Sequence, residues 1–201
     1  MPRIIVLIVM LVLVAPLAIA QVPGMPFSIY AGGGLDFPSQ PDSFKEDFKT
    51  GYHGFAAVGF DWFLAVQLVG KIELHKLPGK GDALRFSDPF GVPVTVDAPD
   101  LQIWLFGGDL RASIGVPGAS TKPFALGGIG VARLAHGDIN SINDITVPVP
   151  WEDETKFYWN IGGGVEFGGP VKMFAQIRYV SILTGDDNTS LIPISVGLRF
   201  F

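Results

Sequence analysis

Residues 192–200 read IPISVGLRF, and every second side chain in this stretch is apolar. The residues between them are proline, small or charged: Pro193, Ser195, Gly197 and Arg199. Successive side chains of a β-strand point to opposite faces, so this alternation predicts a strand with one fully apolar face. Such a strand fits between lipid on one side and a packed interior on the other.

The same alternation recurs in the preceding stretch, VKMFAQIRY at residues 171–179, and in six further segments. Several of them approach the roughly 9–11 residues that a tilted strand needs to cross a bilayer. The expected strands cover about 27–35, 52–60, 63–74, 101–114, 123–134, 156–167, 171–182 and 191–201.

The links between these segments alternate in length. Short links fall at 61–62, 116–121 and 168–170, whereas long polar links fall at 36–51, 75–100, 135–155 and 183–190. Short turns on one side and long loops on the other are typical of outer-membrane barrels. We therefore predict an all-β fold, an eight-stranded antiparallel up-and-down transmembrane β-barrel. A soluble lipocalin-like binder is disfavoured because the apolar faces lie opposite most of the charges.

Aromatic residues collect near the two ends of the expected strands, where amphipathic rings favour the membrane interfaces. The expected periplasmic band comprises Phe27, Phe60, Trp62, Phe63, Phe124, Phe167 and Phe200. The expected outer band comprises Tyr52, Trp104, Phe157, Trp159 and Tyr179.

The first twenty residues have the pattern of an export signal. Arg3 precedes an apolar run at residues 4–14, and Ala18-Ile19-Ala20 offers a small-x-small cleavage site. We expect a cleaved signal peptide at 1–20 and an outer-membrane β-barrel domain at 21–201. An uncleaved membrane anchor is the alternative interpretation.

Composition excludes several classes of protein. The chain is 48% hydrophobic and 16% charged with a net charge of −5, which argues against disorder and against nucleic-acid binding. It has no cysteine, which excludes disulfides, thiolate metal sites and a cysteine nucleophile. None of the glycine clusters completes a dinucleotide-binding motif, so we expect no cofactor.

Charged residues fall on the faces expected to point inward. Eight strands leave room for side chains but not for an aqueous channel, and a buried ion must be paired. We expect one lumenal charge network that closes the barrel, with a proton or ion path as the alternative. Its members are Lys71, Glu73, Asp109, Arg111, Glu166, Arg178 and Arg199, with Lys172 and Arg133 as further candidates.

The chain has three histidines, His53, His75 and His136, and all are expected in or beside the outer loops. A lipid-cleaving triad at the outer leaflet is conceivable there, but no compact histidine–serine motif is visible. We expect solvated histidines, no metal site and no enzyme. Residues 135–155 carry five acids and no lysine or arginine. They suit solubility or divalent cations that bridge lipopolysaccharide, although no calcium-loop pattern is present.

These segments together resemble the small outer-membrane β-barrel family of the OmpA/OmpX-like class. Residues 173–179 are similar to its penultimate strand, where a glutamate often precedes the arginine; this chain has Gln176 at that place. In the family, the barrel assembly machinery recognises an aromatic residue at the end of the last strand. The resemblance thus implies an assembly signal formed by Ile194, Val196, Leu198 and Phe200.

The resemblance also implies location and partners. The location is the bacterial outer membrane. The implied partners are outer-membrane lipid and lipopolysaccharide, the assembly machinery during insertion, and an extracellular ligand of unknown identity. Because the family spans adhesins, stabilisers and proteins of unknown role, we expect a structural or surface-interaction role through four extracellular loops. The alternatives are a lipid-modifying outer-membrane enzyme and a small pore or transporter.

Overall fold

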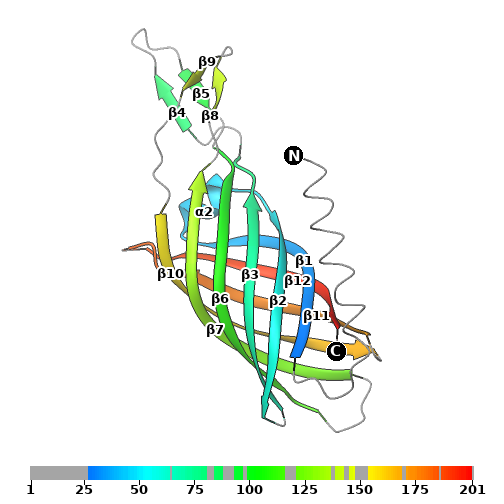
Figure 1. Cartoon of the computed structure of the whole chain (residues 1–201). Helices are drawn as coiled ribbons and strands as arrows, with labels where there is room; N and C mark the ends of the chain where they lie inside the picture. Colours follow the sequence, from blue (N-terminus) through cyan, green and yellow to red (C-terminus); the bar gives the residue numbers. More distant parts are fainter. Residues whose placement is uncertain are drawn as a thin grey trace, which may run out of the picture.

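Eight long strands form a closed barrel in this computed structural model (Figure 1), in the spatial order β1-β12-β11-β10-β7-β6-β3-β2. Their bounds are β1 Phe27–Gln40, β2 Gly51–Phe63, β3 Val66–Leu77, β6 Leu101–Ser113, β7 Thr121–His136, β10 Glu154–Gly168, β11 Val171–Ile182 and β12 Thr189–Phe200. All neighbouring pairs are antiparallel, and β1 pairs with both β2 and β12. The predicted fold is confirmed.

The structure describes residues 27–63, 65–80, 84–87, 93–96, 99–115, 121–136, 139–142, 145–147, 154–168, 171–185 and 187–200. The predicted signal peptide at 1–20 lies outside the described residues. Within the described ranges, no helix combines the length and the hydropathy needed to cross a membrane.

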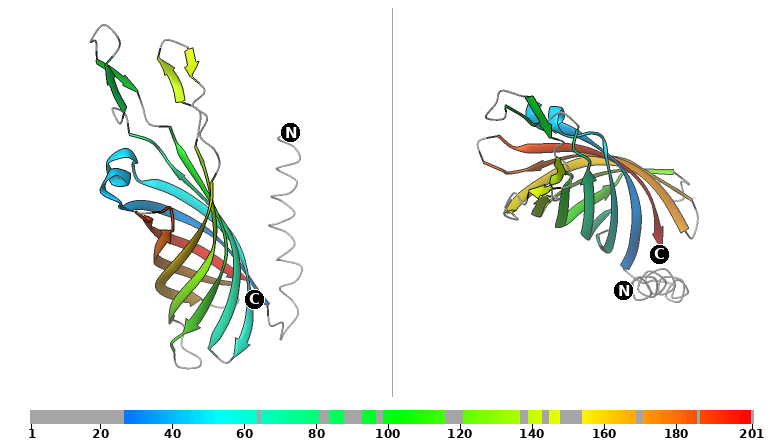
Figure 2. Two further views of the ribbon diagram at one scale, coloured as in Figure 1. Left: turned by 90° about the vertical axis from the view of Figure 1, so that its left-hand side faces the viewer. Right: turned by 90° about the horizontal axis from the view of Figure 1, so that it is seen from above.

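The connections alternate in length as predicted, which defines a long-loop end and a short-turn end of the barrel (Figure 2). Three of the long connections, predicted only as long polar links, contain secondary structure of their own. The first contains helix α2 (Asp42–Asp47). Two others contain antiparallel hairpins, one of β4 (Leu84–Ser87) and β5 (Pro93–Val96) and one of β8 (Ile139–Ile142) and β9 (Ile145–Val147).

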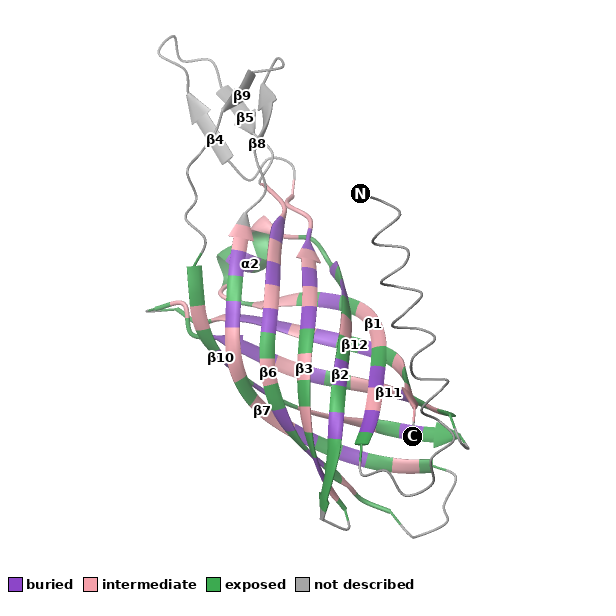
Figure 3. Cartoon of the chain, viewed as in Figure 1, coloured by how far each residue is buried: buried purple, intermediate pink, exposed green. Residues whose placement is uncertain are grey.

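Burial alternates along the barrel strands (Figure 3) because their side chains point in turn outward and into the lumen. In β12, Ile194, Val196 and Leu198 are exposed on the outside, whereas Ser195 is buried inside. The outward faces predicted for the other strands follow the same rule, as with Leu110 of β6. The barrel is therefore covered by aliphatic and aromatic side chains.

Much of the lumen near the long-loop end is filled by an apolar cluster, which was not predicted from the sequence. Inner faces there carry a cluster of buried residues from the strand ends: Leu77, Leu101, Ile103, Leu105, Ala132, Leu134, Tyr158, Val180, Ile182 and Leu191. Phe44 of α2 belongs to the same cluster. The apolar side chains fill the barrel at this end.

Helix α2 is held in place by bonds between two long connections. The Lys49 amide donates to the Pro78 carbonyl at 2.9 Å, and the Lys80 amide donates to the Asp47 carbonyl at 2.7 Å. On the outer side of α2, the Lys45 ammonium lies 2.8 Å from Asp42 and holds the pKa of that exposed carboxyl below its usual value. The backbone bonds keep Phe44 against the apolar cluster.

Glycines make room for large side chains in the narrow lumen. A Cβ on Gly130 would lie 2.6 Å from the Tyr158 ring, and one on Gly107 would meet the Tyr158 hydroxyl. The turn between β10 and β11 needs glycine for another reason: Gly168 has φ +121°, a left-handed conformation that other residues rarely adopt.

Candidate functional site

The charged side chains predicted for the lumen fall, among the described residues, into two groups, one around Glu73 and one around Glu166. The first group lies nearer the apolar cluster, and the second lies nearer the short-turn end. The sequence analysis expected a single network, and that expectation is wrong. The reason is steric, because aromatic rings occupy the lumen between the two carboxylates.

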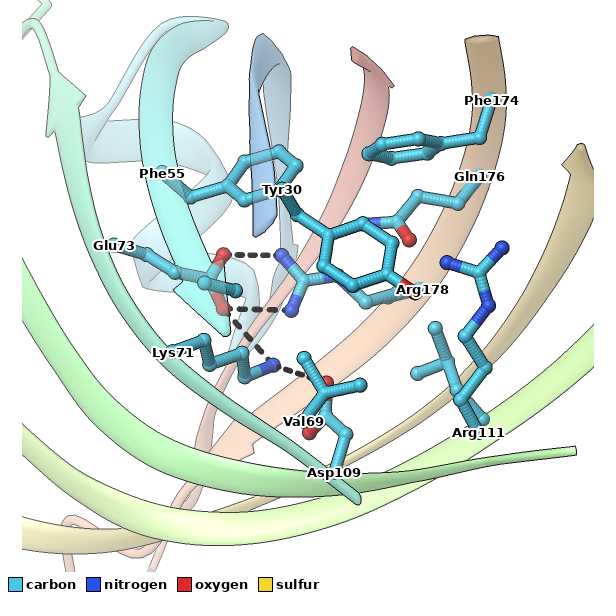
Figure 4. Close-up of a pocket in the computed structure, with 12 residues that line it drawn as sticks. Tyr30, Phe55, Val69, Lys71, Glu73, Asp109, Arg111, Phe174, Gln176 and Arg178 are labelled. Atoms are coloured by element: carbon cyan, nitrogen blue, oxygen red, sulfur yellow. Dashed lines mark hydrogen bonds and ion pairs between the residues drawn. The ribbon is translucent and has the colours of Figure 1, made fainter. Parts of the chain in front are cut away.

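The ion pairs of the Glu73 group join β3, β6 and β11, which are not all neighbours (Figure 4), and Asn160 adds β10. Arg178 donates from Nη1 to Glu73 Oε1 at 2.7 Å and from Nη2 to Glu73 Oε2. Lys71 Nζ lies 2.9 Å from Glu73 Oε1 and 2.9 Å from Asp109 Oδ2. Asn160 Nδ2 donates to the other Asp109 oxygen at 2.9 Å. Both carboxylates are thus paired, which offsets the cost of burying their charge.

The Glu166 group places three cations around one carboxylate. Arg111 Nη2 donates to Glu166 Oε2 at 2.6 Å, and Arg199 Nη1 donates to Oε1 at 3.1 Å. Lys172 Nζ lies 3.4 Å from Oε1 and is 29% exposed. A pocket of about 440 Å³ at the short-turn end is lined by Glu166, Lys172 and Arg199, among others. Solvent therefore reaches this group but not the first.

Aromatic side chains separate the two groups. The Arg111 guanidinium lies 3.6 Å from the centroid of the Phe124 ring and 5.2 Å from that of Tyr30. Phe124 is thus buried in the lumen, and its predicted place in the periplasmic band is wrong. A cavity of about 30 Å³ remains between Arg111, Tyr30 and Arg178, with space for about two water molecules.

The structure places all seven predicted network residues on the inner face. Lys71, Glu73, Asp109 and Arg178 form the first group, whereas Arg111, Glu166 and Arg199 form the second. Lys172 joins the second group. The further candidate Arg133 is exposed instead, because it shares its phase with the outward-facing Ile129.

Two histidines expected in or beside the outer loops are buried in the barrel. His53 lies in β2 and His75 in β3, and both contact the Asp36 carboxylate at 2.9 Å. The sequence analysis ended the first and third strands at residues 35 and 74, one residue short of this cluster. The strand phase was the available signal, since His75 continues the inward series Lys71, Glu73. The third histidine, His136, ends β7.

The profile of the outer membrane protein beta-barrel domain family matches residues 4–200, almost the whole chain. The chain belongs to this family. It is a small β-barrel protein of the bacterial outer membrane, as the resemblance implied. The eight strands described above are its membrane-spanning strands.

Solved outer-membrane barrels share the fold at low sequence identity. The crystal structure of Neisserial surface protein A aligns with a TM-score of 0.58 at 12% identity, covering 87% of this chain and 96% of that one. OprG from Pseudomonas aeruginosa aligns with a TM-score of 0.48 at 12% identity over 88% and 96% of the two chains. Yersinia pestis Ail in a nanodisc gives 0.47 at 14% identity over 87% and 99%. A search of curated proteins finds no match.

The predicted assembly signal lies on the last barrel strand. Ile194, Val196 and Leu198 face outward, and Phe200 pairs with Ile29 of β1. Recognition of these residues by the assembly machinery stays a prediction. Gln176, which replaces the glutamate common in the family, lines the cavity beside Arg178, whose partner is Glu73 instead.

Proposed function

We propose that this outer-membrane barrel is a closed anchor that presents four extracellular loops to a ligand outside the cell. The observation that carries this proposal is the filled lumen. The apolar cluster, the Glu73 group and the aromatic layer follow one another along the barrel, and the cavity between them measures about 30 Å³. From this filling we infer that the protein acts through its loops rather than through its lumen.

The long connections span residues 41–50, 78–100, 137–153 and 183–188. They share one end of the barrel, which we assign to the cell exterior because outer-membrane barrels keep their short turns in the periplasm. The acids at 135–155 suit cation-bridged contact with lipopolysaccharide. A lipid headgroup layer and an extracellular ligand are therefore the partners we propose.

The test of the closed barrel is conductance in planar bilayers. We expect no stable unitary currents from the wild-type protein, because the apolar cluster, the Glu73 group and the aromatic rings leave no open path for ions. Stable currents that change with Glu73→Gln would instead support the pore alternative.

The test of the loops is exchange for a short turn. Replacing residues 137–153 by a short turn should leave the barrel folded, since loops tolerate such changes better than strands do. Binding to cells or extracellular matrix should be lost with this loop or with one of the other three. Binding that survives all four exchanges would contradict the proposal.

A serine, a histidine and an aspartate do lie in the order of a hydrolase triad, which bears on the enzyme alternative. Ser195 Oγ is 2.8 Å from His53 Nε2, and His53 Nδ1 is 2.9 Å from Asp36 Oδ1. A nucleophile must reach its substrate. Ser195 is 0% exposed and faces the lumen, away from lipid. We therefore propose no catalytic role, and a fluorophosphonate probe should leave Ser195 unmodified.

A further inference from the structure

Asp36 of β1, His53 of β2 and His75 of β3 converge inside the barrel, and the closed-anchor proposal uses none of them. Each imidazole places Nδ1 2.9 Å from a different oxygen of the Asp36 carboxylate. The two rings stack with centroids 4.9 Å apart. One ligand atom from each residue lies within 4.8 Å of the others, and all three side chains are 0% exposed.

The second nitrogen of each imidazole also has a neighbour. His53 Nε2 lies 2.8 Å from Ser195 Oγ, and His75 Nε2 lies 3.5 Å from Glu73 Oε2. Metal-binding histidines are typically oriented as His53 is, with the free ring N–H directed at an oxygen, whereas His75 Nε2 makes only the longer contact without a hydrogen bond. When Nε2 carries the proton, both Nδ1 lone pairs face the Asp36 carboxylate. In that tautomer, a cation bound between the two nitrogens and the carboxylate would remove the repulsion between their lone pairs.

The surrounding charges also require added positive charge. The carboxylates of Asp36, Glu73 and Asp109 face only two fixed cations in this group, Lys71 and Arg178. A protonated imidazole or a metal ion would supply the missing charge, so the charge count alone does not choose between them.

The geometry of the contacts is compatible with a metal ion. The His75 Nδ1 contact with Asp36 has hydrogen-bond geometry, but His53 Nδ1 and Asp36 Oδ1 have no hydrogen-bond partner although they lie 2.9 Å apart. A shared proton must lie near the line between its two atoms. A metal ion bound to both atoms lies off that line, which the misaligned contact permits.

We propose that Asp36, His53 and His75 bind one divalent transition-metal ion of the zinc class inside the barrel. Imidazole nitrogens with one carboxylate suit such ions, whereas calcium and magnesium prefer oxygen ligands alone. Metal–ligand bonds of about 2.0–2.2 Å set tetrahedral ligand atoms roughly 3.3 Å apart. The three ligand atoms here lie within 4.8 Å of one another, so binding one ion would need only small side-chain movements.

The metal site would connect strands on both sides of the β1–β12 pairing, which closes the barrel. Its ligands come from β1, β2 and β3, and Ser195 adds β12 through His53. Because the metal ion would compete with protons for Nδ1 of His53 and His75, the affinity for the metal should fall as the pH is lowered. This role differs from the loop function and does not depend on it.

The test measures zinc content and cobalt absorption of the full chain folded in detergent micelles. Metal is supplied both during folding and afterwards, and excess metal is removed by gel filtration. We expect one zinc ion per chain in the wild type, and visible Co²⁺ bands of a nitrogen-ligated site. His53→Gln, His75→Gln and Asp36→Asn should lose both signals. Ser195→Ala should weaken binding by roughly 10–100-fold.

His136→Gln is the matched control, because it removes the one remaining histidine of the chain and should change neither signal. A heat-dependent shift in gel mobility reports folding of each variant. Wild-type barrel that folds without retaining zinc and without Co²⁺ bands would overturn the proposal. So would equal zinc in folded wild type and folded His53→Gln. If the ligand variants do not fold, the proposal is tested by the Co²⁺ spectra of the wild type and of Ser195→Ala. Bands in the wild type with weaker Co²⁺ binding in Ser195→Ala would support it, and no bands in the wild type would overturn it.

Discussion

Arg178 on β11 reaches across the lumen to Glu73 on β3, and its two terminal nitrogens bind both oxygens of that carboxylate. The two strands are not neighbours in the barrel. The pair therefore braces opposite walls, unlike an ion pair between adjacent strands. Paired contacts of this kind are stronger and more directional than single hydrogen bonds.

Glu73→Gln should lower the free energy of unfolding by about 3–5 kcal/mol, because Arg178 would stay buried without its counter-charge. Urea titration in detergent micelles measures the change. The matched control is Lys76→Gln, which breaks the exposed pair of Lys76 with Asp100 and should cost less than about 1 kcal/mol. Similar losses in both variants would contradict a bracing role.

Glu166→Gln should also destabilise the barrel, since Arg111 would lose its counter-charge in a buried position. Lys172→Gln should cost at most about 1 kcal/mol, because that side chain is partly exposed. The urea midpoints of unfolding of the two variants are compared, provided that the dependence of the free energy of unfolding on urea concentration (the m-value) is unchanged. A larger loss of stability in Lys172→Gln than in Glu166→Gln would contradict this expectation, because the partly exposed Lys172–Glu166 pair would then matter more than the buried Arg111–Glu166 pair.

Gly107→Ala and Gly108→Ala form a matched pair of neighbours on opposite faces of β6. A Cβ on Gly107 would lie 2.7 Å from the Ile129 carbonyl oxygen and would also meet Tyr158, so we expect a loss of about 1–3 kcal/mol from overpacking. A Cβ on Gly108 finds its nearest atom at 3.8 Å, and we expect a change within about 0.5 kcal/mol. Thermal unfolding of both variants checks the difference. Equal stability would mean that the lumen is less tightly packed than described.

Ile194→Arg should lower stability by roughly 2–4 kcal/mol if the site lies near the bilayer midplane, because a charge would face lipid. Ile194→Leu keeps the apolar surface and should fold like the wild type. Unfolding in lipid vesicles is the measurement. Equal folding of both variants would place residue 194 outside the hydrocarbon layer.

Period-two patterns predicted the barrel well, because lipid outside and packing inside impose opposite requirements on alternate residues. The same rule placed Glu73, Asp109 and Glu166 inward. It did not predict the apolar cluster at the long-loop end, because the inner residues Leu101 and Ile103 of β6 are apolar like the residues of its outer face.

Which inward side chains contact one another in the lumen could not be predicted from the alternation of apolar and polar residues. Strand phase places Arg111 inward but does not say that its guanidinium lies on Phe124, because that contact depends on the stagger between non-adjacent strands. The Asp36 cluster was missed for a related reason: three residues distant in the sequence meet only when the barrel is closed.

Closure has a further consequence for how the chain tolerates change. Eight pairings share one ring, and the last of them joins Phe200 to Ile29, so no strand has a free edge along which to slide. A one-residue slip in any pairing would reverse the faces of a strand and would need an opposite slip elsewhere for the ring to close. Single-residue insertions within a strand should therefore disturb the register of strand pairing around the whole barrel. Insertions in the long loops leave that register unchanged.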